Sequence, residues 1–97
     1  MIKHDKILNN LEKRIKNYGK YSKVLKNVEY KTSYSQGEVD LLAYDQKHDV
    51  WTMYEVKSSN YRSRVFKAFE QYRRFEAAFP QLRTKGVLVT PTRVMRL

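Results

Sequence analysis

Two strand-like runs joined by a short polar turn constrain the fold of this chain most strongly. Glu38 to Tyr44 and Val50 to Lys57 are rich in aliphatic and aromatic side chains, and Asp45 to Asp49 between them is polar. Runs of this length and composition, separated by a turn, are typical of an antiparallel β-hairpin. Any fold proposed for the chain therefore has to be built around this hairpin.

Side chains on a strand alternate between its two faces, which assigns the residues of the hairpin. In the first strand the residues predicted to face the core are Val39, Leu41 and Ala43. Asp40 falls on the opposite face, among apolar neighbours. In the second strand Glu55 and Lys57 share a face with Trp51 and Met53. A turn near Gln46 and Lys47 brings Asp40 close to Glu55.

The other elements follow from helical spacing and from the residues that start and stop helices. The sequence predicts helices over Asp5 to Tyr18 and Arg62 to Phe79, and further strands over Val24 to Thr32 and Gly86 to Thr90. The order is αβββαβ, an α/β fold with one central mixed sheet, in a single domain of residues 1–97. Pro91 to Leu97 either extend the sheet or form a dimer contact.

The apolar faces of both helices can be assigned from the same spacing. In the first helix the face carries Ile7, Leu8, Leu11 and Ile15. In the second it carries Val65, Ala68, Phe69, Tyr72 and Phe79, with Phe75 at its margin. His4 and His48 are far apart without metal-ligand spacing, and we expect both at the surface.

The net charge of +10 on 97 residues favours a polyanionic partner, with DNA the leading candidate. A basic surface without such a partner is the alternative. The chain has no cysteine and no apolar run of roughly 20 residues, so we expect an intracellular protein (cytoplasmic or nucleoid, cellular or virus-encoded) away from membranes. It has no glycine-rich phosphate loop, so we expect no nucleotide cofactor. The small core suggests a homodimer.

The acid, acid-x-Lys set formed by Asp40, Glu55 and Lys57 suits phosphodiester hydrolysis. Magnesium binds oxygen ligands and needs only one or two carboxylates from the protein. A lysine beside it could orient or activate water, or could pair with the scissile phosphate. The alternative is a salt bridge at an edge strand. Charged groups inside apolar strands are costly to leave unpaired, which favours the functional interpretation.

The run from Gly37 to Ala43, GEVDLLA, followed by Tyr54 to Ser58, YEVKS, resembles the core motif of the PD-(D/E)XK nuclease superfamily. The pattern is similar to that of archaeal Holliday junction resolvases and of small bacterial nuclease-like proteins with a GEIDL…VEVK signature. The resemblance implies a restriction-endonuclease-like core over most of the chain. The proline that names the motif is replaced by Val39, as in many members.

The resemblance also implies roles for individual residues. Asp40, Glu55 and the Val56 carbonyl would be ligands of Mg²⁺, with Mn²⁺ able to substitute, and Lys57 would be the catalytic lysine. A first-helix glutamate near the metal would be Glu12, whose alternative is a solvent-facing charge. Residues that could contact DNA from the preceding loop and the second helix are Ser33, Ser35, Lys67 and Gln71, each with a plain surface role as the alternative.

Basic and aromatic residues also follow the Glu55 strand, in Asn60-Tyr61-Arg62-Ser63-Arg64, with Lys67 one turn further on. We expect Tyr61, Arg62, Arg64 and Lys67 to contact the phosphate backbone. The resemblance, together with the charge, implies a magnesium-dependent DNA endonuclease selective for branched or single-stranded DNA, with a role in recombination or repair. The alternative is a nucleic-acid-binding module that keeps the fold without catalysis.

Overall fold

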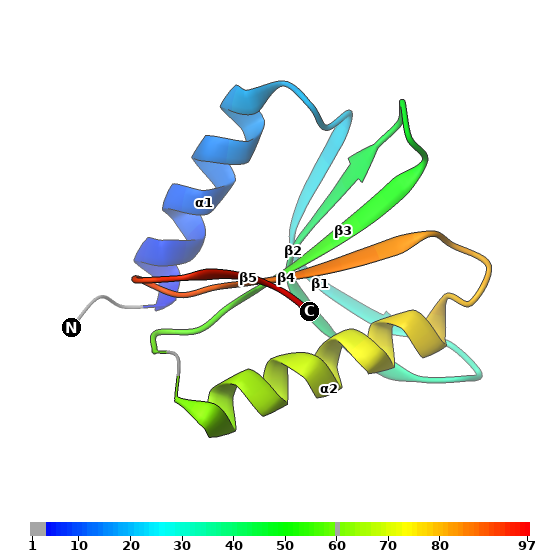
Figure 1. Cartoon of the computed structure of the whole chain (residues 1–97). Helices are drawn as coiled ribbons and strands as arrows, with labels where there is room; N and C mark the ends of the chain where they lie inside the picture. The colour runs from blue at the N-terminus through cyan, green and yellow to red at the C-terminus, as the bar shows by residue number, and fades with distance from the viewer. Residues whose placement is uncertain (1–3, 60) are drawn as a thin grey trace.

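The computed structural model describes residues 4–59 and 61–97 and shows an α/β chain with one mixed sheet (Figure 1). Its elements are α1 (His4–Tyr18), β1 (Lys23–Lys31), β2 (Gln36–Asp45), β3 (Val50–Val56), α2 (Arg62–Ala78), β4 (Thr84–Val89) and β5 (Val94–Arg96). The predicted order αβββαβ is confirmed, and one short strand follows it. No helix in the described ranges is long and apolar enough to cross a membrane.

The five strands lie in the order β1-β2-β3-β4-β5. Strands β1, β2 and β3 are joined by turns and pair antiparallel, whereas β3 and β4 pair parallel. Parallel neighbours need a crossover connection, and α2 provides it. Strand β5 pairs antiparallel with β4, so the segment from Pro91 to Leu97 extends the sheet.

Helix α1 covers one face of the sheet with the side chains that its spacing predicts. Ile7, Leu8, Leu11 and Ile15 are all buried, and they form a core with Leu41, Ala43, Val56 and Val89. Burial of an aliphatic side chain contributes roughly 1.5–3 kcal/mol, so this stripe fixes the helix on the sheet. The helix ends before Gly19, whose φ of 74° is a conformation that glycine adopts readily.

Helix α2 covers the opposite face, on a stripe rotated from the predicted one. Its buried residues are Ala68, Tyr72, Phe75 and Ala78. Phe75, predicted at the margin, is 2% exposed and lies at the centre, whereas Val65, Phe69 and Phe79 are half-buried. The Tyr30 ring of β1 packs 5.7 Å from the Phe75 ring and so selects this rotation. Gly86 of β4 allows α2 to approach the sheet closely, because a Cβ at this position would lie only 2.7 Å from the Tyr72 ring.

The side-chain alternation of β1 and β2 changes at one position in each strand. Leu41 and Ala43 face α1, whereas Val39 packs with Leu42 and Phe75 on the α2 side. On β1 the change falls at Asn27, whose φ is 54°. The paired positions between the two strands skip from Lys26–Leu41 to Val28–Val39, so Asn27 and Asp40 form an interruption in the ladder. The prediction that Val39 shares a face with Leu41 and Ala43 is therefore wrong, because it assumed regular strand geometry.

Candidate active site

The interruption at Asp40 also separates β2 from β3. The last paired position toward the carboxyl end of β3 is Leu41–Tyr54, and the next positions, Asp40 and Glu55, are not paired. Instead the Val56 N–H donates a hydrogen bond of 2.8 Å to Asp40 Oδ2. The Asp40 side chain thus occupies the fork between the strands. The structure brings Asp40 and Glu55 together, as the hairpin geometry predicts.

Glu55 is the most deeply buried ionisable side chain of this cluster, at 1% exposed. Burial raises its pKa to about 8, and repulsion from Asp40 adds to the rise, while the Lys57 charge partly offsets it. Its Oε1 atom is buried and makes no hydrogen bond to any of the described residues. A buried carboxyl oxygen without a hydrogen bond is costly, so this position carries a polar group that the packing alone does not explain.

Lys57 follows Glu55 on the same side of β3, immediately after the strand ends. Its backbone N–H donates to the Val89 carbonyl at 3.0 Å, which continues the pairing with β4. The side chain is half-buried, and no carboxylate of the described residues lies within 4.0 Å of its Nζ. The ammonium is therefore positioned by the strand and is not held in an ion pair.

His4 joins this cluster from the first turn of α1. Its Nε2 atom lies 3.3 Å from Asp40 Oδ2, and its Nδ1 atom lies 3.6 Å from Asp5. The sequence predicts a surface position for His4, and the side chain is indeed partly exposed. No signal in the sequence identifies the contact with Asp40, because helical spacing does not say which turn of a helix passes a given strand.

Glu12 lies in a different polar cluster. Its carboxylate is 3.3 Å from Lys16 Nζ and 3.5 Å from Lys26 Nζ, and the hydrogen bond from Lys16 holds its pKa below the usual range. At 1.5 Å per residue it lies about 12 Å along the helix from His4. The structure does not bring Glu12 to Asp40 and Glu55, and His4 takes the place on α1 that Glu12 was expected to fill.

Gln71 of α2 lines a pocket near the Glu55 side of the sheet. The pocket has a volume of about 220 Å³ and is lined by Tyr30, Gly37, Glu38, Gln71 and Arg74. Burial raises the pKa of Tyr30, with a smaller contribution from the Glu55 charge that the Arg74 charge opposes. The Oε1 atom of Gln71 is buried and has no hydrogen-bond partner among the described residues.

The remaining predicted contact residues are distributed over two surfaces. Ser33 is exposed and Ser35 half-buried in the β1–β2 turn, where the Ser35 N–H donates to Thr32 Oγ1 at 3.3 Å. The side chains at the start of α2 are all exposed, namely Tyr61, Arg62, Arg64 and Lys67. Asn60 lies outside the described residues. The structure thus presents a basic helix start after β3, and a β1–β2 turn closed by its own hydrogen bonds.

The groups that could hold a metal are oxygen atoms. Among residues 4–59 and 61–97, no cluster of three or more His, Cys, Asp and Glu side chains has an arrangement suited to a metal ion. Two carboxylates, those of Asp40 and Glu55, do converge. In a strand the N–H and C=O of one residue point to the same neighbour, so the Val56 carbonyl also points toward the fork.

Comparison with known proteins adds no assignment. No model of a protein family matches the chain, and searches among curated proteins and solved structures find no significant match.

Proposed function

We propose that this chain is a magnesium-dependent DNA endonuclease with a PD-(D/E)XK core, selective for branched or single-stranded DNA. One observation carries the proposal: Asp40 is held in the β2–β3 fork by the Val56 N–H, beside the buried Glu55 and ahead of Lys57. Among the described residues, Glu55 Oε1 has no hydrogen-bond partner and Lys57 has no ion pair. The motif GEVDLLA…YEVKS supports the superfamily assignment. The net charge of +10 supports a nucleic-acid substrate.

The residues of the fork fit a hard divalent cation. Burial is the main cause of the raised pKa of Glu55 and repulsion from Asp40 adds to it, and a cation bound between the two carboxylates would offset both effects. Asp40, Glu55 and the Val56 carbonyl supply only oxygen atoms, which Mg²⁺ and Mn²⁺ prefer. When bound, the ion supplies Lewis-acid chemistry, since it acidifies water and neutralises negative charge that develops on the phosphate.

The protein groups have distinct tasks in this proposal. Val56 fixes Asp40 through its N–H, and the pairing of β3 with β4 fixes Glu55 and Lys57. The Lys57 ammonium pairs with the scissile phosphate or orients the attacking water. His4 contacts Asp40 and therefore acts as a positioning residue in this scheme.

The exposed residues at the start of α2 provide the approach for DNA. Tyr61, Arg62, Arg64 and Lys67 would contact the phosphate backbone, and such contacts position DNA without reading its sequence. Gln71 reaches the wall of the pocket near Glu55. Ser33 and Ser35 of the β1–β2 turn complete the proposed DNA contacts. Specificity would then come from DNA shape and deformability.

A homodimer fits a structure-selective nuclease, because a two-fold axis places two equivalent sites on two strands of a branched substrate. An intracellular location and a role in DNA recombination or repair belong to the same proposal.

The test incubates the folded chain with labelled four-way junction, single-stranded and linear duplex DNA. Cleavage should require Mg²⁺ or Mn²⁺, should stop with a chelator, and should be fastest on junction or single-stranded DNA. Sedimentation of the same sample reports the oligomeric state. Intact substrates under all of these conditions would refute the nuclease proposal.

The second candidate is a nucleic-acid-binding module that keeps this fold without catalysis. The small number of metal ligands favours this candidate. Among the described residues only two carboxylates lie in the fork, and Glu12 pairs with Lys16 and Lys26 instead. Calorimetry with Mg²⁺ and Mn²⁺ separates the two candidates. A nuclease should give a saturable binding heat with the ion, of either sign, and that signal should be lost in Asp40→Asn, whereas the module should bind DNA without binding either ion.

A further inference from the structure

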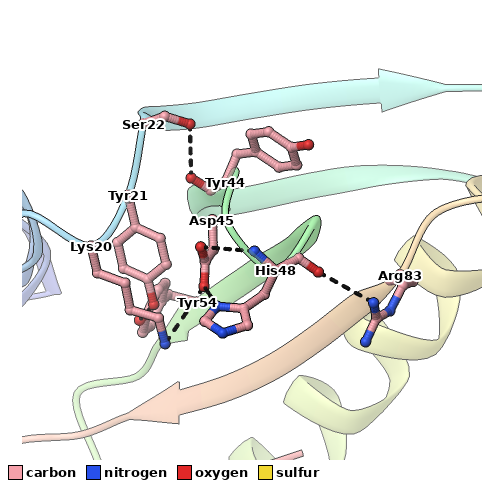
Figure 2. Close-up of polar contacts among 8 residues, drawn as sticks. All are labelled: Lys20, Tyr21, Ser22, Tyr44, Asp45, His48, Tyr54 and Arg83. Atoms are coloured by element: carbon pink, nitrogen blue, oxygen red, sulfur yellow. Dashed lines mark hydrogen bonds and ion pairs between the residues drawn. The ribbon is translucent and has the colours of Figure 1, made fainter.

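A second cluster of charged residues lies around Asp45, the last residue of β2 (Figure 2). Asp45 is 4% exposed, and its Oδ2 atom lies 2.7 Å from His48 Nδ1 and 4.0 Å from Lys20 Nζ. The hydrogen bond from His48 is the largest cause of the low pKa of Asp45. Arg83 donates to the His48 carbonyl at 3.2 Å. This network closes the β2–β3 turn, and the negative charge of Asp45 interacts with His48 and Lys20 within it.

Asp45 and His48 of this network line a pocket in which positive charge exceeds negative charge. It has a volume of about 440 Å³, and its cationic wall consists of Lys20, Arg83, Lys85 and Arg96. No carboxylate of the described residues lies within 4.0 Å of the Lys85 or Arg96 head groups. Thr52 and Thr84 add hydroxyl groups to the lining. Unpaired cations and hydroxyl donors around one cavity suit a phosphate group.

An apolar groove adjoins this pocket, and Lys20 lines both. The groove has a volume of about 290 Å³ and includes Tyr18, Tyr21, Tyr54, Val89 and Val94. The hydroxyl groups of Tyr21 and Tyr54 lie 2.7 Å apart, and Figure 2 shows both rings beside Lys20. Tyr18 is 76% exposed, so a face of its ring is free to stack.

The groove exists because α1 leaves part of its face of the sheet open. The helix packs on β1, β2 and β3, and Val94 of β5 remains 69% exposed on the same side. Strand alternation places Thr52, Lys85 and Arg96 on this face, beyond the end of α1, and Val89 and Val94 beside the helix. The apolar groove and the cationic pocket therefore lie on the same face of the sheet.

We propose that the pocket and groove together bind one nucleotide, with its phosphate against Lys20, Lys85 and Arg96 and its base on Tyr18. Phosphate alone would use the pocket but not the groove, whereas a nucleotide has a charged and an aromatic part that match both. The combined size is that of an ordinary small-molecule site. The ligand is either a free mononucleotide or a nucleotide unit of a single strand, where stacking and backbone charge act together.

This site is separate from the proposed nuclease site and goes beyond it. Asp45 lies five residues from Asp40, about 16 Å along an extended strand. Binding at Lys85 and Arg96 needs no divalent ion, because the cations belong to the protein. The experiment is therefore run in the presence of a chelator, and its result does not depend on whether the chain cleaves DNA.

The test measures calorimetric binding of thymidine 5′-monophosphate, an eight-residue oligothymidylate and inorganic phosphate to the full chain at low salt. The pocket variant is Lys85→Gln with Arg96→Gln. The matched control is Lys13→Gln with Lys47→Gln, which removes the same charge from exposed positions outside both cavities. The pocket variant should bind the mononucleotide or the oligonucleotide about tenfold more weakly, and the control should lose less than about threefold.

Tyr18→Leu separates a nucleotide from a simple anion. It should weaken nucleotide binding about fivefold and leave phosphate binding unchanged. If only the oligonucleotide binds, and the pocket variant weakens that binding, the ligand is a unit of single-stranded DNA. If the mononucleotide binds as well, the site accepts nucleotides in general. Equal losses in the pocket and control variants, nucleotide binding unaffected by Tyr18→Leu, or no binding of either nucleotide would each overturn the proposal. Chemical denaturation of each variant checks that it is folded.

Discussion

The Val56 N–H donates a hydrogen bond of 2.8 Å to the Asp40 carboxylate, at the position where β2 would otherwise continue its pairing with β3. The carboxylate replaces a backbone carbonyl as the acceptor for this N–H. The side chain is thereby held in the plane of the sheet, next to Glu55. In a regular hairpin the Asp40 side chain would project from one face of the sheet, whereas here it is fixed between two strands.

Asp40→Asn tests the role of this carboxylate. The amide oxygen can still accept the Val56 N–H, so the fold should be kept, but the negative charge is lost. We expect cleavage of junction DNA to fall by about 100-fold or more, since a ligand contributes several kcal/mol to charge stabilisation at a metal site. Glu70→Gln, which removes one negative charge from an exposed position on α2 that the proposal does not use, is the matched control and should cleave normally. An unchanged rate for Asp40→Asn would show that the site is elsewhere.

His4 and Glu12 give opposite predictions because they lie in different clusters. His4 contacts Asp40, and loss of a group that orients a metal ligand commonly weakens metal binding by about 10-fold or more. His4→Ala should therefore raise the Mg²⁺ concentration for half-maximal cleavage. Glu12→Gln, which removes only contacts with Lys16 and Lys26, should leave it unchanged. The measurement is a magnesium titration of the cleavage rate, and the reverse ranking would restore Glu12 to the site.

Glu55 makes the stability of the metal-free protein depend on pH. Its pKa is about 8 in the folded chain, against an ordinary value of 4.5, so the folded state retains a proton that the unfolded state releases. The stabilising contribution is complete below pH 4.5 and is lost as the pH rises toward 8, at about 1.4 kcal/mol per pKa unit. Glu55→Gln should thus be more stable than the wild type at pH 8 by a few kcal/mol.

The same pair of proteins should have similar stability below pH 4.5, where Glu55 increasingly carries its proton in both the folded and the unfolded state. Urea denaturation at several pH values in the presence of a chelator measures the difference. A gap between the two proteins that stays constant with pH would show that packing, and not ionisation, sets the cost of burying Glu55.

Phe75 and Phe66 are on the same helix but differ in burial. Phe75 contacts the rings of Tyr30 and Phe79, and removal of a buried phenyl ring costs about 3–5 kcal/mol. Phe66 is exposed, so its loss should change the free energy of unfolding by less than about 0.5 kcal/mol. Urea denaturation of Phe75→Ala and Phe66→Ala gives both values. Equal losses would mean that α2 rotates differently on the sheet.

Local patterns were sufficient to predict most of the elements from sequence. The four aliphatic residues of α1 repeat at helical spacing without interruption, and each is buried as predicted. The hairpin and its turn likewise follow from composition that is local to residues 38–57. The buried face of α2 was predicted only in part: Phe75 lies at its centre and not at its margin. Aromatic residues are so frequent in this helix that several of its faces have similar apolar content. Only contact with Tyr30 of a distant strand distinguishes them.

The candidate site was predictable only in part for a related reason. Glu55 and Asp40 converge because the hairpin register brings them together, and that register is encoded locally. The contact of His4 with Asp40 spans 36 positions in the sequence and depends on where α1 crosses the sheet. The change of face at Asn27 and Asp40 could not be derived from a period of two, which presumes an unbroken strand.

The left-handed residue in β1 has a consequence for how molecules of this protein meet one another. Strand β1 is an edge of the sheet, and its outer backbone groups could template the addition of a foreign strand. The positive φ of Asn27 departs from the extended conformation, and the exposed side chains of Lys23 and Lys31 would repel a like-charged copy. The distortion that accompanies Asp40 thus makes this edge a poorer template for strand addition than a regular strand would be.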